Sequence, residues 1–263
     1  MSPDFELRGV SLEYRSGIRA LDSLDLTINH GEQVAIVGAN GSGKSTLLKI
    51  LDGLIFPTSG AVRAFGSPLS EDALEEPAFR REFRSKVSFV FQEADVQLFC
   101  SNGRDELAFG PLQLGLDEGE VERRVNEVAA QLRIDKLLDR PPYSLSGGEK
   151  KRLAIGSVLT MDPQVLLLDE PSAALDPRSQ VWLLGVLDTW KREGRTAIVA
   201  THDLSAAAES ADRMVVLSED HALVADGPPE EVLAQRELLL AANLIHEHSH
   251  RHQSITHSHS HAH

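Results

Sequence analysis

The chain has 263 residues, enough for one large domain or for a core with one inserted subdomain. Its hydrophobic content of 41% is ordinary for a globular chain with a buried core, and its net charge of −14 argues against nucleic acid as a partner, because neutralising phosphates needs clustered Lys and Arg. The single cysteine, Cys100, excludes an internal disulfide and fits a reducing cytosol.

Membrane spans and export signals are not expected in this sequence. The first ten residues, "MSPDFELRGV", lack the basic and apolar regions of a signal peptide, and no apolar run reaches the roughly 18 residues of a transmembrane helix. The densest basic stretch, Arg80 to Lys86, is interpreted as a solvated face in preference to a membrane patch. If the protein works at a membrane, another chain must bring it there.

Strands dominate the first part of the chain. "FELRGVSLEYRSG" and "LDSLDLTI" alternate in polarity, which predicts two strands of an antiparallel sheet. "EQVAIVG" is a short apolar run typical of a buried parallel strand. "KSTLLKILDG" then predicts a helix that Gly53 closes.

Strands and helices alternate through the rest, which predicts an α/β fold with a parallel-sheet core. Buried strands are expected at "KVSFVFQ", "VLLLDEP" and "TAIVATHD", and "MVVLS" and "ALVADG" are expected to add edge strands. Helices are expected over 118–138, where Val121, Val125, Val128 and Leu132 are spaced helically, over 177–193, and from "GPPEEVLAQ", with Pro229 in its first turn.

A phosphate-binding loop is predicted at "GANGSGKS", because this G-x-x-x-x-G-K-[ST] pattern follows a strand and opens a helix. The glycines let backbone N–H groups surround phosphate oxygens, and the helix N-terminus adds partial positive charge. Lys44 is expected to reach the β- and γ-phosphates, and Ser45 to hold Mg²⁺. The predicted ATP-binding residues here are Gly38, Asn40, Gly41, Ser42, Gly43, Lys44, Ser45 and Thr46.

The acidic partner of this loop is expected in "VLLLDE". The apolar strand delivers Asp169 to its end, where the carboxylate can bind Mg²⁺. Glu170 follows and can polarise a water for attack on the γ-phosphate. Together the two motifs predict a nucleoside triphosphatase.

A second phosphate contact is predicted at "LSGGEKKR". Ser146 and Glu149 have the spacing of a capping box, and two glycines between them leave the backbone bare at a helix N-terminus. Because the phosphate loop already binds the nucleotide of its own chain, this second helix N-terminus is expected to bind the nucleotide held by another molecule. Alone, "LSGGE" would be interpreted as a plain capped helix.

From residue 4 to about 243 the chain resembles the ATP-binding-cassette ATPases, through "LSGGE", "SAALD" and "THD". The resemblance implies that Ser146, Gly147 and Gly148 bind the γ-phosphate held by Lys44 of a second copy. It also implies a role in ATP binding or hydrolysis for four further residues: Gln92 as the Q-loop glutamine that senses Mg²⁺ and the membrane partner, His202 as the switch histidine, Asp176 as the D-loop aspartate and Tyr14 as the ring stacked on adenine.

The resemblance implies a P-loop NTPase fold, with an N-terminal antiparallel β subdomain and an inserted α-helical subdomain at about 93–145. The ATPase domain would span 1–243, followed by a His-rich tail at 244–263. In transporters of the family, the helical subdomain and the Q-loop form a groove that receives a helix of the membrane partner.

Two stretches, "FQEADVQLF" and "LAFGPLQLGL", resemble the ATPases of energy-coupling-factor importers, particularly their cobalt and nickel branch. This implies an ATP- and Mg²⁺-dependent homodimer on the cytoplasmic face of the membrane, docked on a transmembrane coupling component and a substrate-binding component. An importer of a vitamin or another small solute stays an alternative. A soluble ATPase acting on nucleic acid and a metallochaperone with a decayed ATPase are the other rivals.

The tail "HEHSHRHQSITHSHSHAH" alternates histidine with other residues, and imidazole binds Ni²⁺, Co²⁺, Zn²⁺ and Cu²⁺. In an extended segment, each run of alternating histidines would line one side of the chain. The low apolar content, however, predicts a flexible tail whose geometry a bound metal would impose. A native metal-buffering tail, a functionless end and a purification tag are the three interpretations. The candidate metal ligands are His246, His248, His250, His252, His257, His259, His261 and His263.

Overall fold

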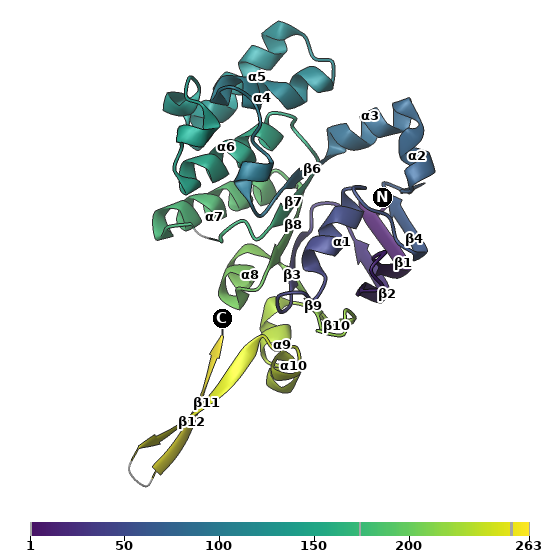
Figure 1. The fold of residues 1–263 in the computed structure, drawn as a ribbon, viewed down its shortest axis with the longest axis vertical. Helices are drawn as coiled ribbons and strands as arrows, with labels where there is room; N and C mark the ends of the chain where they lie inside the picture. The colour runs from purple at the N-terminus through teal and green to yellow at the C-terminus, as the bar shows by residue number, and fades with distance from the viewer. Residues whose placement is uncertain (1, 174, 253–254, 263) are drawn as a thin grey trace. The chain divides into compact units, whose positions relative to one another are not determined.

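The computed structural model describes residues 2–173, 175–252 and 255–262, and its chain divides into two compact units (Figure 1). Unit 1 comprises residues 1–70 and 198–263, and unit 2 comprises residues 71–197. The second boundary falls inside strand β8 (Thr196–Thr201). None of the helices in the described residues is long and apolar enough to cross a membrane.

The N-terminal part of unit 1 is an antiparallel sheet, as the alternating pattern predicts. Its strand order is β2-β1-β4-β5, with β1 and β2 paired from Phe5↔Ile28 to Glu13↔Arg19. Burial follows the two-residue period of a half-buried sheet over parts of both strands, and the register shifts after Leu7, where the period is broken. The bounds are β1 (Phe5–Glu13), β2 (Arg19–Ile28), β4 (Ser59–Ala64) and β5 (Ser67–Pro68).

The rest of unit 1 contains the buried parallel strand that precedes the phosphate loop. β3 (Gln33–Val37) is buried at every position and pairs in parallel with β9 (Arg213–Leu217), while β10 (Leu223–Gly227) pairs antiparallel with β9. β9 therefore lies between β10 and β3, and the prediction that "MVVLS" is an edge strand is wrong. Its burial agrees with its run of apolar residues, which has no polar face to present to water.

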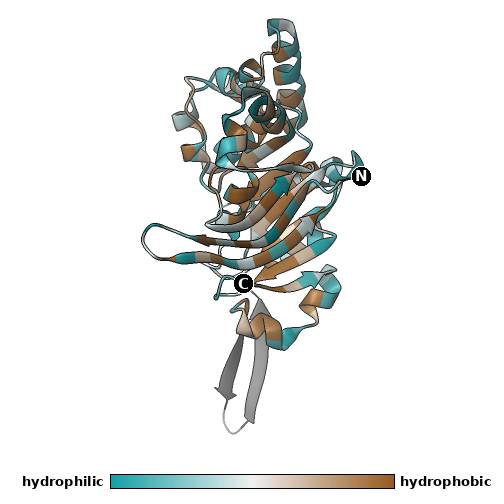
Figure 2. Cartoon of the chain, turned by 90° about the vertical axis from the view of Figure 1, so that its right-hand side faces the viewer, coloured by the Kyte–Doolittle hydropathy of each residue, from teal (hydrophilic) through white to brown (hydrophobic). Residues whose placement is uncertain are grey.

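Helices complete this layer of unit 1. A core of small and aliphatic side chains from β3 and β9 packs against residues of α8 (Leu204–Ser210), α9 (Pro229–Leu233) and α10 (Arg236–Ala241). Figure 2 shows hydrophobic residues, in brown, along coloured strands and on parts of the helices. The helix α1 (Lys44–Leu51) follows the phosphate loop, and Gly53 ends it in a left-handed conformation with φ of 65°.

Unit 2 contains two parallel strands and most of the helices. β6 (Val87–Val90) and β7 (Val165–Asp169) are fully buried and pair in parallel, from Val87↔Val165 to Val90↔Leu168. The segment 93–145 holds only helical elements among its described regular structure. The helices of unit 2 are α2 (Glu71–Glu75), α3 (Pro77–Lys86), η1 (Ala94–Val96), α4 (Gly103–Gln113), α5 (Glu118–Leu132), η2 (Asp135–Leu137), η3 (Pro142–Ser144), α6 (Gly147–Leu159) and α7 (Pro177–Arg192).

The helix predicted over 118–138 is shorter than expected. α5 buries Val121, Val125, Val128 and Leu132, as its spacing predicts, but it ends at Leu132. The next residue, Arg133, takes a left-handed conformation with φ of 56°. A left-handed residue stops the ladder of helical hydrogen bonds, and the sequence offers no glycine or asparagine there to announce the stop.

The described backbone of the C-terminal segment forms two strands, and the flexibility of this tail stays a prediction. β11 (Ile245–His252) and β12 (Ile255–Ala262) pair antiparallel, with His246↔His261 and His250↔His257 in register. The histidine alternation has the period of a strand, which agrees with this pairing. The side chains of residues 246–263, and with them all the predicted tail ligands, lie outside the described part of the structure.

Candidate nucleotide site

The phosphate loop of unit 1 is shaped by glycines that other residues could not replace. Gly41 and Gly43 have φ of 87° and 107°, and a Cβ on Gly43 would lie 2.3 Å from the carbonyl oxygen of Ala20. A Cβ on Gly38 would lie 2.4 Å from Oγ of Ser42. The loop is therefore a backbone cradle with little room for side chains of its own.

The cradle suits an anion. The buried hydroxyl of Ser42 has no hydrogen-bond partner in the described residues, and α1 has neither a side-chain cap nor an acidic residue in its first turn. Nζ of Lys44 donates to the carbonyl oxygens of Gly38 and Ala39, at 2.7 and 3.2 Å. A helix N-terminus with an ammonium group beside it is a general phosphate-binding arrangement, so the residues present fit a nucleotide phosphate.

Tyr14 and His202 also belong to unit 1. Tyr14 follows β1, is 41% exposed, and its hydroxyl lies 3.0 Å from Oγ1 of Thr46, so its ring stands next to the start of α1. His202 is exposed between β8 and α8. The neighbouring Asp203 accepts hydrogen bonds from the backbone N–H groups of Ser205 and Ala206.

In unit 2, Gln92, Asp169 and Glu170 gather at one edge of the parallel pair. Because Val90 is in register with Leu168, the residues that follow β6 and β7 leave the sheet at the same edge. Asp169 and Glu170 are both 5% exposed. Glu170 has φ of 43°, a conformation that costs a non-glycine residue energy and is characteristic of functional turns.

The signature corner of unit 2 has the predicted capping box. Oε2 of Glu149 accepts from both the backbone N–H and the hydroxyl of Ser146 at 2.8 Å, and these bonds lower the pKa of the Glu149 carboxyl. Asp176 is the N-cap of α7: its carboxylate accepts from the backbone N–H groups of Arg178 and Ser179, and from Oγ of Ser179 at 2.8 Å. A Cβ on Gly148 would lie 3.4 Å from that hydroxyl, so the signature and D-loop residues are neighbours within unit 2.

Sequence reasoning missed two side chains that contact the Q-loop. Lys151 is 4% exposed and donates to the carbonyl oxygens of Phe91 and Gln92, and Gln97 bonds to Phe91 and Ala154. The signal for Lys151 was available. It lies one helical turn before Ala154 and Ile155, on the apolar face of α6, where a lysine needs buried acceptors.

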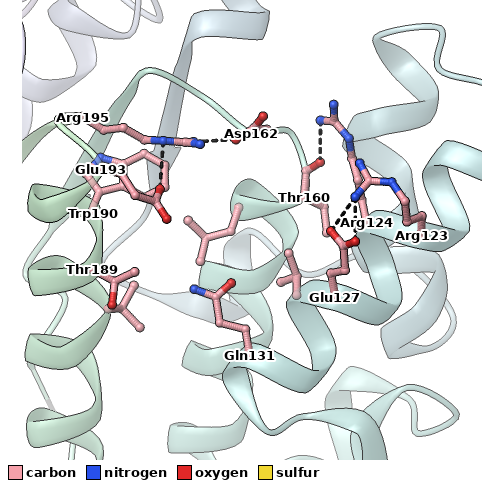
Figure 3. Close-up of a pocket in the computed structure, with 13 residues that line it drawn as sticks. Arg123, Arg124, Glu127, Gln131, Thr160, Asp162, Thr189, Trp190, Glu193 and Arg195 are labelled. Carbon is pink, nitrogen blue, oxygen red and sulfur yellow. Dashed lines mark hydrogen bonds and ion pairs between the residues drawn. The ribbon is translucent and has the colours of Figure 1, made fainter.

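A cavity of about 260 Å³ lies elsewhere in unit 2, among α5, the end of α6 and α7 (Figure 3). Arg124 donates to the carbonyl oxygen of Thr160, and Arg195 pairs with Asp162 and stacks over Trp190. The arginines on its walls are thus held by groups of the chain itself. None of the predicted nucleotide-site residues lines this cavity.

Comparison with known proteins decides the family. The family model described as ABC transporter matches residues 21–173, a stretch that holds the phosphate loop, the Q-loop, the signature and the acidic strand end. The chain belongs to the ABC transporter ATPase family. It is an enzyme that hydrolyses ATP, as the phosphate loop and the strand that ends at Asp169, with Glu170 next, predict.

Relatives of this ABC ATPase agree over nearly its whole length. A protein of Rhodobacter capsulatus named nickel import ATP-binding protein NikO is 50% identical, covering 93% of this chain and 97% of its own. An energy-coupling factor transporter ATP-binding protein of Methanoculleus marisnigri is 41% identical, covering 91% and 84%. The predicted resemblance to importer ATPases of these kinds is confirmed.

Solved structures confirm the fold of the ABC ATPase. The structure of cbiO1 from Clostridium perfringens, described as part of the ABC transporter complex cbiONQ, has a TM-score of 0.78 and 34% identity, covering 93% of this chain and 96% of that one. The ATP-binding cassette MJ0796, described as a dimer in a post-hydrolysis state with ADP and Pi, has a TM-score of 0.78 and 27% identity, covering 86% and 98%.

Proposed function

We propose that this ATPase energises an importer of divalent metal ions, nickel or cobalt, as a nucleotide-sandwich homodimer docked on membrane subunits. The observation that carries the proposal is the 50% identity, over almost the full length of both chains, with the protein named for nickel import. The structural neighbour described as part of the cbiONQ complex supports a multi-subunit assembly. The assembly would hold the ATPase at the cytoplasmic face of the membrane.

In this proposal the phosphate loop binds ATP through its backbone N–H groups and Lys44. Ser45 and Asp169 would hold Mg²⁺, with Gln92 nearby, and bound Mg²⁺ neutralises charge on the β- and γ-phosphates. The fit is supported by the Ser42 hydroxyl, which has no hydrogen-bond partner among the described residues, and by the first turn of α1, which has no side-chain cap. The half-exposed ring of Tyr14 offers a flat face for adenine.

Glu170 is the proposed general base. Its buried carboxylate orients the attacking water and accepts its proton, and His202 contacts the γ-phosphate. The left-handed backbone of Glu170 supports the role, because strained backbone is kept where the position of one side chain matters.

A second copy completes each site through Ser146, Gly147, Gly148 and Asp176. The capping box holds the start of α6 in place, and Gly147 is exposed. In the proposed dimer, this corner of one copy lies against the γ-phosphate that the other copy holds.

An exposed apolar surface in unit 2 supports docking on a membrane subunit. Phe99 is 66% exposed and meets Phe109 edge to face at 4.8 Å, and Leu112 follows one turn later on α4. The buried carboxylate of Glu106 accepts from the backbone N–H groups of Phe99 and Cys100, at 3.0 and 2.8 Å. Glu106 thus fixes the backbone that carries Phe99, and in this proposal the aromatic pair meets a helix of the coupling component.

The alternative cargo is a vitamin or another small solute. It is supported by the relatives named for energy-coupling factor transporters, at 41% identity, whose names specify no metal. The histidine tail favours the metal. Its sequence alternates histidine with other residues, and imidazole is a ligand that suits Ni²⁺ and Co²⁺.

Uptake of radioactive nickel and cobalt tests the proposal. The ATPase is reconstituted in vesicles with a transmembrane coupling component and a substrate-binding component, with ATP on the ATPase side. We expect ATP-dependent uptake of one of the two metals. Glu170→Gln should bind ATP and dimerise, yet show a hundredfold or greater loss of uptake and hydrolysis, in line with the loss of a general base (about 10²–10⁴-fold).

Two results would contradict the proposal in different ways. Full hydrolysis by Glu170→Gln would remove the assigned general base. ATP-dependent uptake of a vitamin, without metal uptake, would leave the proposed ATPase role intact and would replace the metal with a vitamin as the transported solute.

A further inference from the structure

The segment that follows β6, residues 91–98, is joined to α6 by side chains rather than by sheet or helix bonds. Lys151 donates from Nζ to the carbonyl oxygens of Phe91 and Gln92, at 2.9 and 3.0 Å. Nε2 of Gln97 donates to the carbonyl oxygen of Ala154 at 2.8 Å, while its Oε1 accepts from the backbone N–H of Phe91 at 3.1 Å. All these residues lie in unit 2.

Further contacts reinforce this connection. Nζ of Lys150 pairs with the Asp95 carboxylate at 2.5 Å, and Nε2 of Gln97 also donates to Oγ of Ser157 at 3.2 Å. Lys150 and Lys151 lie in the first turn and a half of α6, directly after the capping box at Ser146. One end of the connection is therefore the Q-loop and the other is the start of the signature helix.

Lys151 is unusual because its ammonium group is buried and donates to two main-chain carbonyl oxygens. Burial lowers the pKa of its ammonium group to about 8, although the negative charges of Asp169 and Glu170 oppose this shift. A buried ammonium group costs free energy unless hydrogen-bond acceptors are held beside it. The lysine therefore depends on the position of its acceptors, and it holds those acceptors in place in return. The carbonyl oxygens of Phe91 and Gln92 are such acceptors.

We propose that Lys151 and Gln97 are positioning residues that tie the Q-loop to the signature helix, so that the two nucleotide-sensing segments of one copy move as one body. A displacement of residues 91–98 by a docked membrane subunit then reaches Ser146 and Gly147 through α6. The consequence for turnover rests on the proposed function, whereas the connection itself rests on contacts within unit 2.

The test compares Lys151→Met with the wild type in two measurements. Met keeps the length of the side chain and removes the donors. In hydrogen–deuterium exchange we expect faster exchange in the peptides covering 91–98 and 144–149, with β7 unchanged. In ATP hydrolysis we expect kcat to fall about tenfold with KM for ATP within twofold, because a misplaced group lowers turnover while Lys44 and its loop still bind the substrate.

Two further variants separate positioning from simple loss of packing. Lys151→Arg retains donors for the two carbonyl oxygens and should recover at least half of kcat. Gln97→Leu removes the second link and should accelerate exchange in the same two peptides. Its effect on kcat should be smaller than additive when combined with Lys151→Met, because both act on one connection.

Three outcomes would overturn the proposal: exchange that rises equally across unit 2 including β7, exchange confined to 91–98 without change at 144–149, or unchanged kcat in Lys151→Met. A wild type that does not hydrolyse ATP would instead contradict the proposed function. The exchange pattern would still decide whether the two segments are tied.

Discussion

At the scale of single residues, Gly147 and Gly43 illustrate two different reasons for a glycine. The fold requires Gly43, whereas only a bound ligand would require Gly147. A Cβ added there would meet nothing within 4 Å among the described residues, whereas a Cβ on Gly43 would strike the Ala20 carbonyl oxygen at 2.3 Å. The chain itself therefore has no need of glycine at 147. In the proposed dimer the bare backbone there faces a phosphate of the second copy.

Gly147→Ala should therefore leave folding intact and impair catalysis. We expect an unchanged or slightly raised Tm, because alanine is the better helix former by about 0.5–1 kcal/mol. The added methyl group should lower ATP hydrolysis at least about tenfold by displacing the corner from the phosphate. Calorimetry and phosphate release measure the two effects. Gly43→Ala is the control and should lower Tm, and full activity of Gly147→Ala would contradict the sandwich.

The pKa of the Cys100 thiol reports on Glu106, the carboxylate that accepts hydrogen bonds from the backbone at the exposed aromatic pair. Burial, together with the charge of Glu106, raises the pKa of the Cys100 thiol to about 11. At pH 8 only about one thiol in a thousand is ionised, so alkylation should be far slower than that of a free thiol of pKa about 8.5.

Glu106→Gln should lower the thiol pKa and speed alkylation at pH 8, since it removes a negative charge near the sulfur. Iodoacetamide labelling followed by mass spectrometry, from pH 7 to 11, gives the profile. Asp105→Asn on the neighbouring residue is the control, because the charge of Asp105 contributes least to the shift. Equal profiles for wild type and Glu106→Gln would show that Glu106 does not act on this segment.

At the scale of elements, the end of α5 carries strain that a single substitution can relieve. Arg133 holds a left-handed conformation that costs an L-residue roughly 1 kcal/mol and that glycine adopts freely. Arg133→Gly should raise the free energy of unfolding by about 0.5–1 kcal/mol in urea denaturation. Gln131→Gly, on an exposed helical position of α5, is the control and should lower it by a similar amount.

The same helix shows what local sequence could and could not predict. Apolar spacing identified the buried face of α5, and alternation identified β1 and β2, because each pattern directly records which face is buried. The end at Leu132 and the central place of β9 depend on tertiary packing and on partners far away in the sequence. For Lys151 the sequence held half of the signal, its place on the apolar face of α6, but not its acceptors, which lie about sixty residues away. The motifs of the nucleotide site, by contrast, are local loops with fixed spacing.

At the scale of the whole molecule, charge opposes the proposed dimer. Each copy carries a formal charge of −14, and two copies repel each other over a distance that salt shortens, from about 30 Å at 0.01 M to about 8 Å at 0.15 M. The ATP-bound dimer of Glu170→Gln should therefore tighten as salt rises. Sedimentation velocity between 10 and 150 mM NaCl measures this.

The matched control is Glu170→Gln combined with Lys44→Ala, which should stay monomeric with ATP at both salt concentrations because the phosphate loop is impaired. A dimer that weakens as salt rises would mean that attractive charge pairs across the interface outweigh the net repulsion. A dimer that forms equally well without ATP would contradict the sandwich.

The distance along the chain between β3 and β9 has a consequence for biosynthesis. β3 is wholly apolar after Gln33, and one of its neighbours in the sheet, the parallel strand β9, is synthesised about 180 residues later. At a translation rate of about 5–20 residues per second, the ribosome needs roughly 10 to 40 seconds to deliver that neighbour. All of unit 2 emerges in the interval, so β3 of the nascent chain has no β9 to pair with during this time. A chaperone that covers β3 would therefore raise the yield of native protein.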